Sequence, residues 1–82
     1  MPSKKPPTQN PESLTNRIRR LRFDNGEITQ QALAERVGVT RQTIIALEGE
    51  KYVPSLLLAF RLAVTFGVRV EEVFQYEQGK LE

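Results

Sequence analysis

The chain has 82 residues, of which 39% are hydrophobic, and its formal net charge is +2. This length allows one small domain with a tail, and a core of this size would gain stability from a partner subunit. The sequence contains no cysteine and no histidine, which excludes disulfides and makes a zinc site or a nucleophile–base pair hard to build. It contains no run of 18 apolar residues and no signal-peptide pattern. We therefore expect a cytoplasmic protein without a metal, a cofactor or a membrane partner.

The first segment, residues 1–13, contains four of the five prolines and almost no apolar side chains. This composition predicts a flexible tail, because the segment cannot bury enough apolar surface to offset the entropy of ordering it. Its Lys4 and Lys5 could reach an acidic partner, or the tail could serve only solubility. We expect a folded domain over residues 14–77 and a short C-terminal tail over residues 78–82.

The spacing of apolar residues predicts five helices and no sheet, and therefore an all-α fold. The expected ranges are 15–23, 30–36, 41–48, 56–66 and 71–74. Thr29 and Thr40 are expected to cap the second and third helices, and Gly38 to end the second in a turn that needs positive φ. The run FQYE, residues 74–77, could be a short extended edge strand.

The third helix, residues 41–48, has an unusual exposed face. Ile44 and Leu47 set its buried direction, and the opposite side carries small or long polar side chains together with the apolar Ile45. Arginine can donate a pair of hydrogen bonds to guanine, glutamine can pair with adenine, and an apolar group can touch a thymine methyl. This face is either a surface for close approach to DNA or an ordinary solvated face, and this helix alone leaves both readings open.

The preceding helix and the tight turn through residues 38–40 complete a helix-turn-helix arrangement. The run TQQALAERVGVTRQTIIALEGEKYVPSL, residues 29–56, resembles the phage Cro and repressor-type, or Xre-type, regulators, and the likeness extends over about residues 16–77. The resemblance implies a five-helix, lambda-repressor-like DNA-binding domain. It also implies a dimeric transcriptional regulator, most readily a repressor, on a palindromic operator in double-stranded DNA. The alternative is a protein-interaction module of this fold, such as an antitoxin or an adaptor; an enzyme is not expected.

The resemblance places the helix over residues 41–48 in the major groove. The residues that it implies at base edges are Thr40, Arg41, Gln42, Ile45 and Ala46. The residues that it implies at backbone phosphates are Gln30, Thr43, Lys51 and Tyr52, although Tyr52 could equally pack on the fourth helix. Arg22 and Glu48 match an ion pair that joins the first helix to the end of the third in relatives, or they are plain surface charges.

The sequence departs from the family pattern at several positions. Gly49 comes one residue earlier than the glycine of the usual Glu-x-Gly-Lys run, so either the helix ends sooner or Glu50 takes the left-handed conformation. Glu50 also places a negative charge near the expected phosphates. Ala32 replaces the usual acidic capping partner of Thr29, which predicts a weaker cap. Arg69 stands where serine or proline often caps the fifth helix.

The fourth helix is apolar on more than one face. Leu57, Phe60 and Val64 recur along one side, and the family often has charged residues at the positions of Leu57 and Val64. They form either a larger monomer core or a subunit interface, and a palindromic operator would need two subunits. The residues expected at a two-fold interface are Leu57, Phe60, Val64, Val73, Phe74 and Tyr76.

Overall fold

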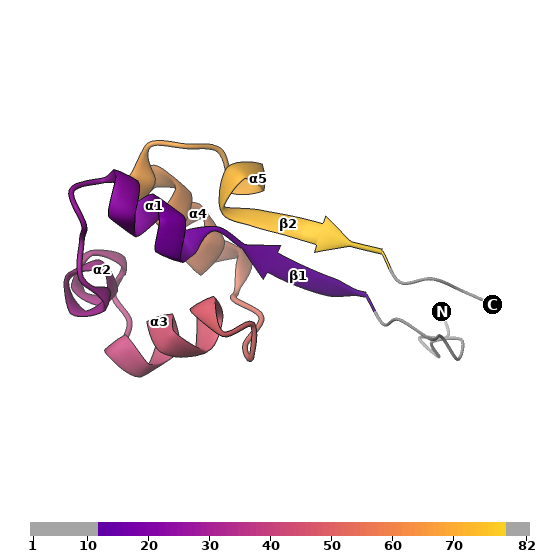
Figure 1. Ribbon diagram of the computed structural model, residues 1–82. Helices are drawn as coiled ribbons and strands as arrows, with labels where there is room; N and C mark the ends of the chain where they lie inside the picture. The colour runs from indigo at the N-terminus through magenta and orange to yellow at the C-terminus, as the bar shows by residue number, and fades with distance from the viewer. Residues whose placement is uncertain (1–11, 79–82) are drawn as a thin grey trace.

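The computed structural model describes residues 12–78 of the chain, and Figure 1 shows their arrangement. This part contains the five expected helices and one two-stranded antiparallel sheet. The helices are α1 (Ile18–Asp24), α2 (Gln30–Val37), α3 (Arg41–Glu48), α4 (Leu56–Phe66) and α5 (Val70–Val73), and the strands are β1 (Ser13–Asn16) and β2 (Phe74–Glu77). The mostly helical, five-helix fold is confirmed, and a small sheet is added to it.

The predicted tails fall mainly on residues 1–11 and 79–82, which lie outside the described residues. The last residue of the predicted N-terminal tail, Ser13, is the first residue of β1. The chain is therefore in regular structure one residue before the expected start of the domain.

The two strands pair along their full length, with Leu14 opposite Tyr76, and form a narrow ribbon that extends from the helical body (Figure 1). The extended conformation expected for the FQYE run is confirmed. The expected start of the first helix at Thr15 is wrong, because this residue belongs to β1. The two strands are about 60 residues apart in the chain, so no local pattern indicated their pairing.

Two hydrogen bonds explain why α1 begins only at Ile18. The side-chain Oδ1 of Asn16 accepts a hydrogen bond from the Ile18 amide two residues later, at 3.1 Å, which forms an Asx turn at the start of α1. The Arg17 amide donates to the Val73 carbonyl at 2.9 Å. The chain just before α1 is thus held by the Asn16 side chain and by the Val73 carbonyl of α5.

The core lies where the five helices meet, and each helix contributes to it. The large side chains that are fully buried are Ile18, Leu33, Val37, Ile44, Leu47, Leu62 and Val73. No polar or charged residue among residues 12–78 is fully buried. Burial of apolar side chains from every helix fixes the helices relative to one another, at roughly 1.5–3 kcal/mol for each large side chain.

The burial of Val73 corrects one expectation. Its side chain is 0% exposed, so it has no surface for a second subunit and its place at an interface was wrong. Phe74 is half-buried and packs against the same core, so only part of its ring can face a partner.

The helix caps follow local sequence closely. The hydroxyl oxygens of Thr29 and Ser55 accept hydrogen bonds from the amides three residues later, at 3.0 and 3.1 Å, so the cap on α2 forms despite Ala32. Arg69 offers no side-chain acceptor at the start of α5. Instead, the carboxylate of Glu72 accepts from the Arg69 amide at 3.1 Å.

Candidate nucleic-acid interface

The turn between α2 and α3 is set by two residues. Gly38 has φ +78°, a left-handed conformation that glycine adopts without steric cost, as expected. The hydroxyl oxygen of Thr40 then accepts a hydrogen bond from the Thr43 amide at 3.2 Å and begins α3. Because this turn is short, α2 and α3 pack directly on each other, and the direction of α3 is fixed by the α2 core residues Leu33 and Val37.

The outer face of α3 is accessible, as the helical spacing of Ile44 and Leu47 predicted. Ile44 and Leu47 are buried against the body, whereas Arg41 and Gln42 are exposed. Ile45 is 37% exposed and Ala46 is half-buried. The face therefore presents two long polar side chains at the N-terminal end of α3, called its leading end below. Shorter apolar side chains follow them along the helix, and such a surface allows close approach of a partner.

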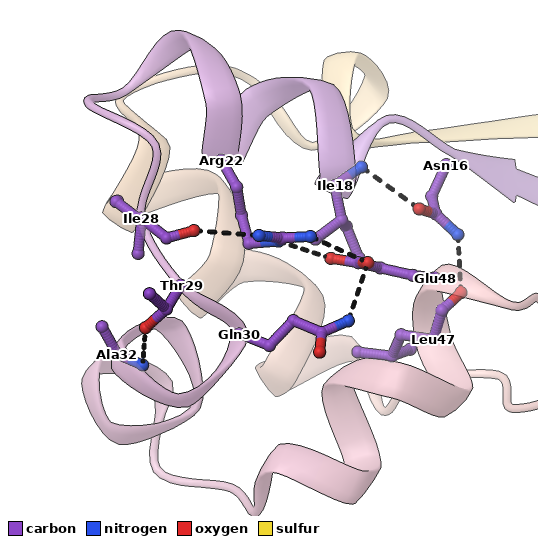
Figure 2. A network of polar contacts seen from close by, with 9 residues as sticks. All are labelled: Asn16, Ile18, Arg22, Ile28, Thr29, Gln30, Ala32, Leu47 and Glu48. Atoms are coloured by element: carbon purple, nitrogen blue, oxygen red, sulfur yellow. Dashed lines mark hydrogen bonds and ion pairs between the residues drawn. The ribbon is translucent and has the colours of Figure 1, made fainter.

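Figure 2 shows the polar network that holds the C-terminal end of α3. Arg22 on α1 makes a two-bond ion pair with Glu48, through Nε–Oε2 at 2.7 Å and Nη2–Oε1 at 3.1 Å. Arg22 Nη1 also donates to the Ile28 carbonyl at 2.9 Å, and Gln30 Nε2 donates to Glu48 Oε1 at 3.1 Å. The side chains of Arg22 and Glu48 are only 17% and 11% exposed, so they are not plain surface charges. The network joins α1, the start of α2 and the end of α3.

Asn16 makes a second connection to the end of α3, and sequence reasoning missed it. Its Nδ2 donates to the Leu47 carbonyl at 2.7 Å while its Oδ1 accepts from the Ile18 amide at 3.1 Å. The carbonyls in the last turn of a helix lack the amide partner four residues on. The Leu47 carbonyl accepts this bond in addition to one from the Glu50 amide at 3.0 Å, so two segments hold the end of α3. The only signal in the sequence was an asparagine near the start of the expected first helix, a residue that often bonds nearby backbone, and this does not indicate a contact 31 residues away.

The expected phosphate-binding residues are in different situations. Gln30 is half-buried and one of its amide hydrogens is used by Glu48. The Thr43 hydroxyl lies 3.1 Å from that of Thr40. Lys51 is exposed, and Tyr52 is 46% exposed.

Tyr52 borders a surface hollow of about 210 Å³ between the ribbon, the end of α3 and the loop that follows it. The residues that line this hollow include Leu14 and Phe74 of the ribbon and none of α4. The hollow therefore gives no support to the alternative that Tyr52 packs on the fourth helix.

The backbone after α3 resolves the question raised by the early glycine. The helix ends at Glu48, Gly49 has an ordinary φ of −84°, and Glu50 takes the left-handed conformation with φ +59°. A side chain in this region costs roughly 1–2 kcal/mol. Glu50 is exposed and directly precedes Lys51, so its carboxylate lies beside a residue expected at phosphate.

We predict that Glu50→Gly raises the free energy of unfolding by about 0.5–1 kcal/mol, because glycine removes the left-handed strain at some cost in unfolded-chain entropy. Urea denaturation measures this change. Glu50→Ala is the matched control, since it removes the charge but keeps a side chain at positive φ. Equal stability of the two variants would show that backbone strain at residue 50 is not costly.

Two titratable groups with shifted pKa lie on α5 and β2, away from α3. A backbone hydrogen bond and the charge of Arg69 lower the pKa of the Glu71 carboxyl. The hydrogen bond from the Tyr76 hydroxyl to Glu12 Oε1, at 2.8 Å, raises the pKa of Tyr76. Both side chains are exposed, and these shifts reflect local pairing at the surface.

The second candidate surface lies on α4. Leu57, Phe60 and Val64 are 61%, 52% and 78% exposed, so they are not part of a larger monomer core. They border an open hollow of about 630 Å³ together with residues from the end of α2 and with Arg61. Arg61 Nη1 donates to the Val37 carbonyl at 3.3 Å and so joins α4 to the end of α2. The result is an apolar strip with charged neighbours.

No group of three or more His, Cys, Asp or Glu side chains between residues 12 and 78 is placed to hold a metal ion. Within the same range, no helix is both long and apolar enough to cross a membrane.

The unit formed by α2, the turn and α3 has an exposed second helix with polar side chains at its N-terminal end. This arrangement defines a helix-turn-helix DNA-binding domain. Residues 18–73 match the family model described as Helix-turn-helix (HTH_3). The chain belongs to this Xre/Cro-type family of helix-turn-helix transcriptional regulators. It is thus a DNA-binding regulator and not an enzyme.

Several curated proteins are similar to the chain. The uncharacterised HTH-type transcriptional regulator MJ0272 of Methanocaldococcus jannaschii is 58% identical over 50 residues, which cover 61% of this chain and 76% of that protein. An uncharacterised HTH-type regulator of Archaeoglobus fulgidus is 44% identical over 68 residues, covering 83% and 96%. The regulator YgzD of Bacillus subtilis is 45% identical over 65 residues, covering 79% and 97%.

Two solved structures share the fold. A candidate DNA-binding protein from Bacteroides fragilis superposes with a TM-score of 0.68 at 26% identity, covering 76% of this chain and 98% of that one. A hypothetical transcription factor, NHTF, from Neisseria superposes with a TM-score of 0.62 at 23% identity, covering 88% and 83%. The second likeness concerns the fold alone.

Proposed function

We propose that the protein binds a specific sequence in double-stranded DNA as a homodimer, with α3 in the major groove, and represses transcription in the cytoplasm. The observation that carries this proposal is the contrast between the two ends of α3. At the C-terminal end, Glu48 is fixed by Arg22 and Gln30. At the leading end, Arg41 and Gln42 are exposed, and neither side chain has a hydrogen-bond partner within residues 12–78. A rigid helix that presents two free polar groups suits base recognition.

The other residues of the face take supporting roles in this proposal. Thr40, Ile45 and Ala46 contact base edges or thymine methyl groups, since small or apolar side chains allow the helix to enter the groove closely. Gln30, Thr43, Lys51 and Tyr52 bind backbone phosphates on the two sides of the helix. Repression is favoured because a bound protein can block a promoter without further contacts, and the relatives are named as transcriptional regulators.

The exposed strip on α4 supports the homodimer. Leu57, Phe60 and Val64 place three large apolar side chains on one face, and small monomers rarely leave such a strip uncovered. Tyr76, 61% exposed on the ribbon, and the free part of Phe74 add to the proposed interface. Two-fold pairing would give the two recognition helices that a palindromic operator requires.

Base reading is tested by Arg41→Ala and Gln42→Ala. Each variant is expected to lose discrimination at particular base pairs, by about 1–3 kcal/mol for each good contact. Binding titrations against an operator and its single-base variants measure the loss. Arg69→Ala, which removes an exposed arginine at the start of α5 that pairs with Glu71, is the control and should leave base preference unchanged.

An unchanged affinity and base preference for Arg41→Ala would contradict the role given to α3. If the wild-type protein shows no salt-dependent binding to promoter fragments, the alternative of a protein-interaction module is favoured, because phosphate neutralisation makes true DNA affinity fall with salt.

A further inference from the structure

A polar surface hollow of about 490 Å³ is lined by residues of α1, of the N-terminal end of α2 and of both ends of α3. Its lining includes Arg19 from α1, Gln30 from α2 and Arg41 from α3, together with the Arg22–Glu48 pair. Because Arg41 lines it, the hollow adjoins the N-terminal end of α3, where the proposed base contacts are made.

The charges in this hollow do not cancel. Glu48 is the only acidic residue in the lining, and it is neutralised by its two-bond pair with Arg22. The remaining charge comes from Arg19 and Arg41, which have no hydrogen-bonding or ion-pair partner among residues 12–78. Two unpaired guanidinium groups beside neutral glutamines form a site for an anion.

The neighbouring residue on α1 is in the opposite situation. Arg20 Nε pairs with Asp24 at 3.1 Å and borders a different hollow, which is also lined by Asp24 and Glu72. On one side of α1 the positive charge of Arg20 is therefore compensated by nearby carboxylates. On the side that faces the α3 hollow, the positive charge of Arg19 has no such compensation.

We infer that Arg19 binds a backbone phosphate of the DNA, and that α1 thereby contributes directly to the DNA interface. This inference rests on the proposed function: when α3 enters the major groove, the strand beside its leading end passes next to the hollow. Arg19 contacts no base edge in this arrangement. Its contribution is to position the duplex and to increase affinity for every sequence equally.

The test compares Arg19→Ala with Arg20→Ala, which remove the same charge from adjacent residues of the same helix. Each full-length variant is titrated against an operator and an unrelated duplex at several salt concentrations. Arg19→Ala should weaken binding to both duplexes by the same factor and reduce the slope of log affinity against log salt by about 0.9 per subunit. Arg19→Lys should keep most of the slope. Arg20→Ala should keep the wild-type slope.

Equal slopes for Arg19→Ala and Arg20→Ala would overturn the inference and leave the proposed function standing, provided that the operator is still preferred. A loss restricted to the operator would overturn it too, because a base contact and not a phosphate contact would then be indicated. A wild-type protein that binds neither duplex would overturn both the inference and the proposed function.

Discussion

Glu48→Ala should lower the free energy of unfolding by about 3 kcal/mol or more, the largest stability effect that we expect from a single change outside the apolar core. Removing one partner of a largely buried ion pair costs roughly 3–5 kcal/mol, because the remaining charge is left without compensation. Here Arg22, whose side chain is 17% exposed in the intact pair, would keep only the Ile28 carbonyl as an acceptor, and Gln30 would lose its partner as well. Such a loss is a large part of the roughly 5–15 kcal/mol by which domains are stable.

The exposed pair of Arg20 and Asp24 provides the control for this prediction. Their side chains are 76% and 46% exposed, and Asp24→Ala should cost at most about 1 kcal/mol. Urea denaturation followed by circular dichroism measures both variants. Replacing both Arg22 and Glu48 by methionine should recover much of the stability, since two apolar side chains of similar volume leave no buried charge. A cost for Glu48→Ala no larger than that for Asp24→Ala would contradict a structural role for the network.

The double change Leu57→Glu with Val64→Glu should produce a monomer that binds its operator about 100-fold more weakly, or worse. Four carboxylates would face one another across a two-fold axis in a contact that should be apolar. A monomer also loses the gain from binding two half-sites at once, which is commonly 10²- to 10⁴-fold. The two positions are 61% and 78% exposed, so the fold should survive and the helical circular dichroism should be unchanged.

Analytical ultracentrifugation at tens of micromolar tests the assembly. Phe23→Glu is the matched control, because this apolar side chain is 63% exposed on α1, outside the proposed interface. It should leave both the sedimentation coefficient and operator affinity unchanged. A wild-type protein that sediments as a monomer would contradict the dimer. A dimer that persists in the double variant would place the interface elsewhere.

The elements that were predicted correctly are those that depend on neighbouring residues. Thr29 and Thr40 cap the helices that follow them, and Gly38 takes positive φ, because each makes its decisive contact within a few residues. The outer face of α3 followed from helical periodicity for the same reason. The pairing of Arg22 with Glu48, 26 residues apart, was available only from resemblance to a family.

The features that sequence reasoning missed depend on contacts between distant segments. β1 exists because it pairs with β2 across most of the chain, and Asn16 finds its acceptor at Leu47. Apolar character alone did not tell a core position from a surface position next to it. Val73 is fully buried, while Val64, equally apolar, is 78% exposed.

Selection of duplexes from a pool of random sequence, with the full-length protein, tests most directly whether the face of α3 reads DNA. We predict an enriched motif with two-fold symmetry and half-sites about one helical turn, roughly 34 Å, apart. With Arg41→Ala, preference should disappear at specific positions of each half-site while the spacing is kept. Bound pools with the same base composition at every position as the starting pool would contradict sequence-specific recognition by α3.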